Sequence, residues 1–356
     1  MSRLDRDLSL KLRFKRLFWR MGYSCPLEVP VSHYEYSGGR RKRTDLTDID
    51  VLGTRFDPAL QPSRVMADCK SSDESHNRIF WLRGAMQYFG ADTAYFVKTR
   101  ISLRDRAIAS RLGIATLDVN GLDRLEKQFD VGSSGLPLAD PGVYAKQLSL
   151  LLAAGHAADD GRSKHVRDAQ HFARYMYWYI PKERRILNLI EVSRNLAPHL
   201  RGDQTCDKYF VYHLGLLLSL ALLEMGGAIL ARDVTDVPGQ VRQYLFGGPM
   251  ALADREKFLA LLNEATGANE RLEPDYFGEL LELINRLVSF PRQASDVPRH
   301  MEALSFIHTL DVPVAVEAAL EDDFSVETLK LAKDVLYLLV KVSGMSSSLI
   351  EELNTT

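Results

Sequence analysis

Thr47-Asp48-Ile49-Asp50-Val51-Leu52-Gly53, together with the later stretch Val65-Met66-Ala67-Asp68-Cys69-Lys70, decides how this chain is interpreted. In both stretches polar residues alternate with apolar ones, which is the pattern of a half-buried β-strand. Residues two apart in a strand share a face, so Asp48 and Asp50 point the same way, as do Asp68 and Lys70. Only a short loop separates the stretches, and we expect two neighbouring strands that bring three carboxylates and a lysine together.

This grouping of side chains predicts metal-assisted phosphodiester hydrolysis. Carboxylates a few Å apart repel each other, and a divalent cation removes that cost. Asp50, Asp68 and the backbone carbonyl of Cys69 would offer the oxygen ligands that Mg²⁺ or Mn²⁺ prefers. The metal would lower the pKa of a bound water, while Lys70 orients or deprotonates the nucleophile. The alternative is an ordinary ion-pair network on a sheet surface, with Asp48 as one more member.

The predicted elements around these strands follow the order α-β-β-β-α-β-α-β. The first is an amphipathic helix that Gly22 ends. Its basic residues are expected on a solvated face, which comprises Arg13, Arg16 and Arg20 and is widened by Lys11 and Lys15. The predicted helices cover residues 4–22, 77–89 and 103–112, and the predicted strands cover 23–36, 47–56, 64–70, 94–99 and 114–119. This order predicts an α/β domain with a central mixed sheet over residues 1–130.

The two stretches resemble the bipartite motif of the PD-(D/E)xK, restriction-endonuclease-like nuclease superfamily, over about residues 1–130. That fold runs helix, three strands, helix, strand, and the stretch Gly113 to Asp118 is similar to a late strand of Mrr-type restriction enzymes and junction resolvases. The resemblance implies that Asp50 and Asp68 ligate the metal and that Lys70 is the catalytic lysine. It also implies a place near the active site for Gln87, whose alternative is a helix surface. Many relatives carry a Glu on the first helix, and none lies between Leu4 and Gly22 here.

Basic residues concentrate in the first part of the chain. Residues 1–130 hold 23 Lys and Arg against 17 Asp and Glu, whereas the remainder holds 22 against 30. A polyanion is therefore expected to meet the first part. A predicted turn after Ser37 would grip nucleic-acid phosphates through its basic residues, which are Arg40, Arg41, Lys42 and Arg43. DNA is the expected partner, with RNA or branched DNA as alternatives.

The rest of the chain changes to a helical period. Residues 131–142 have the Gly, Ser and Pro content of a linker, and residues 143–356 predict an all-helical domain for regulation, self-assembly or a partner protein. The predicted helices lie near 142–156, 163–178, 182–197, 205–231, 252–265, 273–289, 297–309 and 325–343. The apolar segment 211–230 is long enough to span a bilayer, but Glu224 inside it favours a buried central helix.

Composition excludes several other classes. Three distant cysteines form no C-x-x-C pair, which argues against a zinc knuckle and a disulfide framework and favours a cytoplasmic protein. No phosphate-binding P-loop is present, so no motor is built in. The expected function is a Mg²⁺-dependent DNA endonuclease, with a restriction or antiphage role by analogy. The alternatives are a non-catalytic interaction module with the nuclease fold and a HEPN-type ribonuclease site at Arg194 and His199.

Overall fold

The computed structural model describes residues 3–37, 40–70, 76–132, 136–138, 140–155, 164–310, 312 and 314–354. The chain divides into two compact units. The sheet unit comprises Met1–Arg55, Pro62–Ser149 and Leu310–Asp323, and the helical unit comprises Phe56–Gln61, Leu150–Thr309 and Phe324–Thr356. Neither unit is continuous in sequence, because a loop of the first part groups with the helices and a late segment groups with the sheet.

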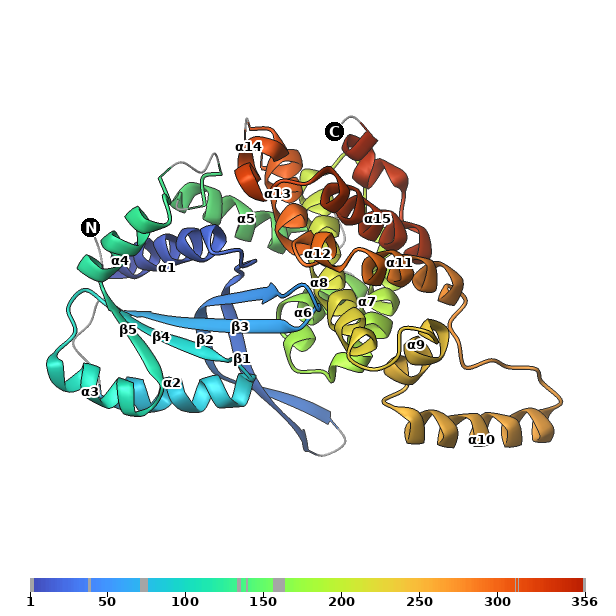
Figure 1. Cartoon of the computed structure of the whole chain (residues 1–356). Helices are drawn as coiled ribbons and strands as arrows, with labels where there is room; N and C mark the ends of the chain where they lie inside the picture. Colours follow the sequence, from blue (N-terminus) through green and yellow to red (C-terminus); the bar gives the residue numbers. More distant parts are fainter. Residues whose placement is uncertain are drawn as a thin grey trace. The chain divides into compact units, whose positions relative to one another are not determined.

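The sheet unit contains a five-stranded mixed sheet with helices on both faces (Figure 1). The strands lie in chain order, with β1 antiparallel to β2 and with β3, β4 and β5 parallel to one another. Its elements are α1 (Arg3–Arg20), β1 (Leu27–Ser37), β2 (Arg40–Phe56), β3 (Pro62–Lys70), α2 (His76–Phe89), β4 (Thr93–Lys98), α3 (Leu103–Arg111), β5 (Ile114–Asp118), α4 (Val119–Gln128), α14 (Val316–Leu320) and the 3-10 helix η3 (Glu321–Asp323); α5 (Pro141–Ala153) begins here. The predicted mixed sheet flanked by helices is confirmed.

Helix α4 was not predicted from the sequence pattern. It begins directly after β5, where the side chain of Asp118 caps it by accepting the Gly121 N–H at 2.8 Å. Asp is among the favoured residues at this capping position. The glycine in the first turn suggests an interruption in the sequence, and here it lies inside the helix.

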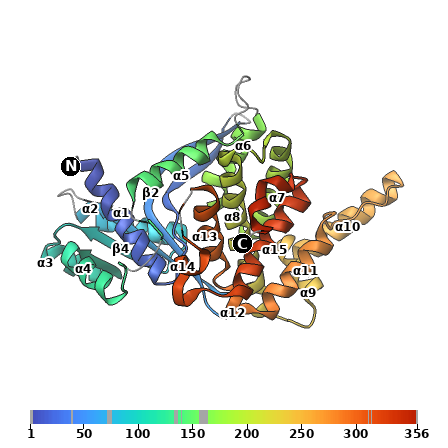
Figure 2. The same ribbon diagram turned by 90° about the horizontal axis from the view of Figure 1, so that it is seen from above.

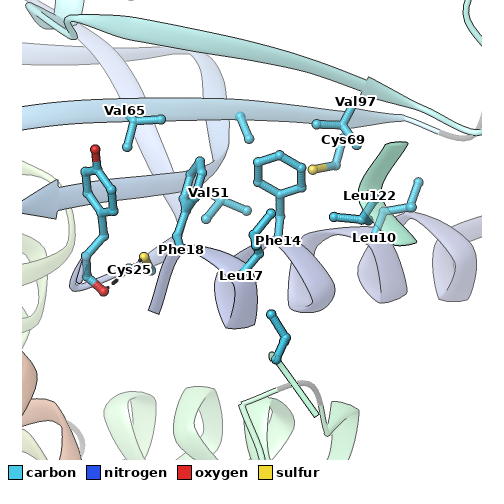
Figure 3. Close-up of a cluster of buried hydrophobic side chains, with 13 residues drawn as sticks. Leu10, Phe14, Leu17, Phe18, Cys25, Val51, Val65, Cys69, Val97 and Leu122 are labelled. Carbon is cyan, nitrogen blue, oxygen red and sulfur yellow. Dashed lines mark hydrogen bonds between the residues drawn. The ribbon is translucent and has the colours of Figure 1, made fainter. Parts of the chain in front are cut away.

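The core of the sheet unit lies between α1 and the sheet (Figure 3). Phe14 and Phe18 of α1 point at the strands, where they meet Val51 and Cys69. Side chains at i and i+4 of a helix share one face, which is why the apolar spacing of α1 produces this contact.

The prediction of a solvated basic face on α1 is wrong. Lys11 and Lys15 are 8% and 5% exposed. Arg13 donates to Glu126 and Asp123 of α4, with nitrogen to oxygen distances of 2.5 to 3.0 Å. The charges of α1 are thus matched by other elements of the sheet unit, and one of those elements is the unpredicted helix.

The prediction of a basic turn after Ser37 is also wrong, because the backbone of residues 40–43 lies in a strand. Strands β1 and β2 pair as far as Ser37 and Arg40, so the backbone of Arg40 to Arg43 belongs to β2. The error arises because β2 begins earlier than the predicted strand 47–56, and its first residues continue the antiparallel pairing with β1. The side chains of Arg40, Arg41 and Lys42 lie outside the described residues, while Arg43 pairs with Asp45 at 2.9 Å.

The helical unit is formed around α8 (Thr205–Leu230). The other elements are α6 (Lys164–Arg174), α7 (Lys182–Leu196), α9 (Val237–Leu245), α10 (Pro249–Thr266), α11 (Phe277–Ser289), α12 (Pro291–Ala294), α13 (Val297–Thr309), α15 (Val326–Ser343) and the 3-10 helices η1 (Met176–Trp178), η2 (Ala197–His199) and η4 (Ser347–Asn354). No strand forms among the described residues from 140 onward, as predicted. Helix α10 extends away from its neighbouring helices (Figure 1, Figure 2).

Helix α8 alone, within the described ranges, is long and apolar enough to cross a membrane by length and composition. Most of it is buried inside the helical unit, as predicted for a central helix. Its Glu224 forms a buried pair with Arg185 of α7 at 2.8 Å, which compensates the charge. The loop residue Leu60 packs on the same helix, where a Cβ on Gly227 would overlap the Leu60 carbonyl.

Candidate active site

The predicted catalytic residues lie on two neighbouring strands of the sheet unit. Asp50 is on β2, and Asp68 and Lys70 are at the end of β3. Both carboxylates are buried, with Asp50 1% and Asp68 2% exposed. One oxygen of Asp50, Oδ2, accepts the backbone N–H of Cys69 at 2.6 Å and lies 3.5 Å from Nζ of Lys70. The fold therefore brings Asp50 and Lys70 into contact, with Asp68 adjacent to Lys70 on one strand face.

A lysine from α1 completes the surroundings of Asp50. Nζ of Lys11 lies 2.8 Å from Oδ1 of Asp50 and 3.1 Å from Oε1 of Glu28. Burial lowers the pKa of Lys11, but the two carboxylates outweigh it and raise this pKa above its ordinary value. Lys11 is thus held as a cation beneath the site.

Asp68 is held by an arginine from α2. Nε and Nη2 of Arg78 lie 2.7 to 3.1 Å from the two oxygens of Asp68, in a bidentate arrangement. The guanidinium also stacks 4.1 Å from the ring centre of Trp81, which fixes its position. Burial raises the pKa of Asp68 in spite of the opposing effect of Arg78.

The charges of the site form two layers. The side chains of Asp50 and Asp68 are 0% and 2% exposed, whereas those of Lys70 and Arg78 are 25% and 28% exposed. Solvent and any ligand therefore meet cations first, with the carboxylates directly beneath them. A phosphate group is the ligand that such a surface attracts, because its oxygens accept from both ammonium and guanidinium groups.

The oxygen atoms at this site suit a hard divalent cation in part. The N–H and C=O of one strand residue point to the same edge, so the Cys69 carbonyl lies on the edge that faces Asp50. Two carboxylates and this carbonyl match the preference of Mg²⁺ for oxygen. In the part of the chain that the structure describes, no three His, Cys, Asp or Glu side chains group as metal ligands. Asp48 is half-buried, and its charge is one of the smaller causes of the raised pKa of Arg78.

The thiol of Cys69 does not belong to this donor set. Its side chain is buried in the core under α1, on the opposite strand face from Asp68. Burial, together with Asp50 and Asp68, raises the pKa of the Cys69 thiol well above its usual range. A thiolate, and with it a soft metal, is therefore disfavoured here, and the backbone of this residue is what faces the carboxylates.

The other residues that the sequence suggested for a site do not lie beside Asp50 and Asp68. Gln87 is exposed on α2, nine residues or about 13 Å along the axis beyond Arg78. In the helical unit, Arg194 pairs with Asp275 at 2.7 Å and the ring of His199 stacks on His165. No described contact joins Arg194 to His199, so the HEPN-like pattern is not assembled as a pair.

Sequence reasoning missed Lys11, Arg78 and Glu28 as partners of the carboxylates. The burial of Lys11 could have been predicted from its position next to the apolar stripe of α1, directly after Leu10. The signal for Arg78 was its place in the first turn of a helix that follows β3, since such helices begin at the carboxyl ends of the strands.

The raised pKa of Asp68 predicts a stability gain from its removal. Because the pKa of Asp68 is higher in the folded protein than in the unfolded one, ionisation of Asp68 destabilises the fold. The contribution of Asp68 to the free energy of unfolding is greatest below the unfolded pKa of about 3.9 and is lost as the pH rises through the pKa of the folded protein. Asp68→Asn should therefore raise the free energy of unfolding by about 1 kcal/mol at pH 7, because it removes a buried negative charge. Arg78 is accessible enough to remain hydrated in the variant. The measurement is urea denaturation without metal, from pH 7 down to pH 3, where the gain should disappear. An unchanged or lower midpoint at pH 7 contradicts the prediction.

The chain thus combines an α/β unit, which has a cation-covered pair of carboxylates on neighbouring strands, with a mostly helical unit. In comparisons with known proteins, no protein-family model, no curated protein and no solved structure matches this chain.

Proposed function

We propose that the sheet unit is a metal-dependent nuclease of the PD-(D/E)xK type, with DNA as its substrate. The observation that carries the proposal is the contact of Lys70 with Asp50, next to Asp68 at the end of the neighbouring strand. The accessible layer of Lys70 and Arg78 supports a phosphate-containing substrate. A restriction or antiphage role, with regulation or assembly through the helical unit, remains part of the proposal by analogy.

Each residue of the site would have a separate role in phosphodiester hydrolysis. Water attacks phosphorus, one ester P–O bond breaks, and the products are a phosphate monoester and a hydroxyl group. Mg²⁺ or Mn²⁺ bound by Asp50, Asp68 and the Cys69 carbonyl would make a bound water acidic and offset negative charge. Lys70 orients the attacking water and stabilises charge on the phosphoryl oxygens. Lys11 holds Asp50 in place from below.

A second candidate, a non-catalytic nucleic-acid-binding module, is favoured by one observation. Arg78 engages both oxygens of Asp68, and Lys11 engages Asp50, so protein cations already neutralise the carboxylates. A module that kept the fold and lost the metal would have this arrangement.

Cleavage assays separate the two candidates. The full chain is incubated with Mg²⁺, Mn²⁺ or EDTA and with supercoiled plasmid, linear duplex, branched duplex, single-stranded DNA or RNA. The nuclease proposal expects cleavage of DNA that depends on the metal. If every substrate survives with both metals while duplex DNA is still bound, the binding module is correct and the nuclease assignment fails.

Arg78 competes with the metal for Asp68, which leads to a measurable prediction. Arg78→Met removes the bidentate contact and frees both oxygens, so the affinity for Mn²⁺ should rise by about tenfold. Isothermal titration of the metal measures the affinity, and the metal-induced increase of the melting temperature should grow in parallel.

The control for this experiment is Arg106→Met, because Arg106 pairs with Asp118 at the end of β5 and not with the two catalytic carboxylates. That variant should bind the metal as the unmodified chain does. Equal or weaker affinity in Arg78→Met would show that Asp68 is not a metal ligand.

A further inference from the structure

A further lysine lies beside the proposed active site. Lys98 is the last residue of β4 and is 7% exposed. Among the residues that the structure describes, its ammonium group has neither a hydrogen bond nor an ion pair. The ammonium is also not among the fully buried side-chain nitrogens that lack a partner, so it reaches solvent although the rest of the side chain is buried. An accessible ammonium group without a protein partner is available to an anionic ligand.

The register of the sheet places Lys98 next to Lys70. The two residues are partners in the parallel pairing of β3 with β4. Tyr95 and Val97 face α1, where Tyr95 packs on Phe14, so alternation directs Lys98 to the opposite face, which is the face of Asp68 and Lys70. Both lysines end their strands at the carboxyl edge of the sheet, where α/β sheets bind ligands.

The nearest acid on the other side of Lys98 is already occupied. Asp118 of β5 is the register partner of Lys98. Its carboxylate receives Nη2 of Arg106 at 2.5 Å and the N–H of Gly121 at 2.8 Å. The Lys98 ammonium is thus left between a cation and an acid that has other partners.

We infer that Lys98 binds a backbone phosphate of the substrate strand next to the one at Lys70. This inference rests on the proposed function and narrows its substrate class to a polynucleotide with consecutive phosphates. Neighbouring strands lie about 4.8 Å apart, and the long lysine side chains let the two ammonium groups separate further. Two lysines on adjacent strands can therefore each contact one of two consecutive phosphates of one strand.

Salt-dependent binding tests the inference without cleavage. Fluorescence anisotropy of a labelled DNA duplex and its single strand is measured with the full chain in EDTA, over a series of salt concentrations. Lys98→Met keeps the length and the apolar stem of the side chain and removes one phosphate contact. The slope of log K against log salt should become shallower by about 0.9 for duplex or 0.7 for single strand.

Two further variants make the result specific. Lys98→Arg should restore the slope, and Lys127→Met, which removes an exposed lysine near the C-terminal end of α4, should leave it unchanged. Circular dichroism and thermal melting check that the variants are folded, and Lys98→Met should be about as stable as the unmodified chain because Met keeps the buried apolar stem of the side chain.

The outcomes are distinct from those of the cleavage assay. A shallower slope in Lys98→Met supports the inference even if no substrate is cut. An unchanged slope in that variant overturns it even if DNA is cut, and so does a chain that binds neither DNA form. A slope that falls equally in Lys127→Met also overturns it, because the effect would then be one of general charge.

Discussion

Lys70→Ala is expected to lower the rate of DNA cleavage by about a thousandfold while the protein remains folded. Lys70 is an accessible cation that contacts Asp50, with 3.5 Å between Nζ and Oδ2. A preorganised charge that stabilises the developing phosphoryl charge contributes on the order of 10²–10³ in rate. Its side chain is 25% exposed, so its loss leaves no cavity in the core. Single-turnover cleavage of a labelled duplex with Mg²⁺ measures the effect on the chemical step.

The comparison variant for Lys70 is Lys127→Ala, which removes a lysine from the surface of α4 and should cut normally. Duplex binding by Lys70→Ala should weaken by less than tenfold, since one phosphate contact is lost out of several. If Lys70→Ala cuts as fast as the unmodified chain, the catalytic assignment is wrong. A loss of binding that accounts for the whole loss of rate would make Lys70 a binding residue only.

Lys11→Met is expected to be the most destabilising substitution in the site. The Lys11 and Asp50 side chains are 10% and 0% exposed, and breaking a buried pair of this kind costs about 3–5 kcal/mol. The double variant Lys11→Met with Asp50→Asn should recover most of that loss, because no charge then remains buried alone. Urea denaturation of the single and double variants gives the coupling free energy.

Glu28→Gln serves as the matched control, because Glu28 is the other partner of Lys11 and is 37% exposed. Its effect should stay below about 1 kcal/mol, as for other accessible pairs. The raised pKa of Lys11 means that its contribution is complete below the unfolded value of about 10.4 and is lost as pH rises through the folded value. The stability difference should thus be constant from pH 6 to pH 9. Additive single variants would show that Lys11 and Asp50 do not interact.

The alternation of residues in two strands was sufficient to predict the center of the candidate site. A strand has a period of two, so the order of polar and apolar residues fixes which side chains share a face. This is why Asp68 and Lys70 could be placed together, and why Cys69 could be placed on the other face. The apolar spacing of α1 and the long apolar segment of α8 likewise predicted their burial.

The partners of the carboxylates depended on tertiary structure. Lys11 and Asp50 are brought together by the packing of α1 on the sheet, and Arg78 reaches Asp68 from a separate helix. A basic residue on a helix has the same local pattern whether its neighbour is water or a buried acid, so the sequence favoured a solvated face. Gln87 has the same ambiguity, and its position on α2 leaves it exposed.

By itself the sequence determined the strands, their faces and therefore the grouping of Asp50, Asp68 and Lys70, because these follow from local periodicity. Only the tertiary structure decided that cations from two helices neutralise the carboxylates, that Lys98 lies beside Lys70, and that the loop Phe56–Gln61 groups with the helical unit. The physical reason is that charge pairing and burial depend on which distant segments pack together, and local patterns carry no information about that choice.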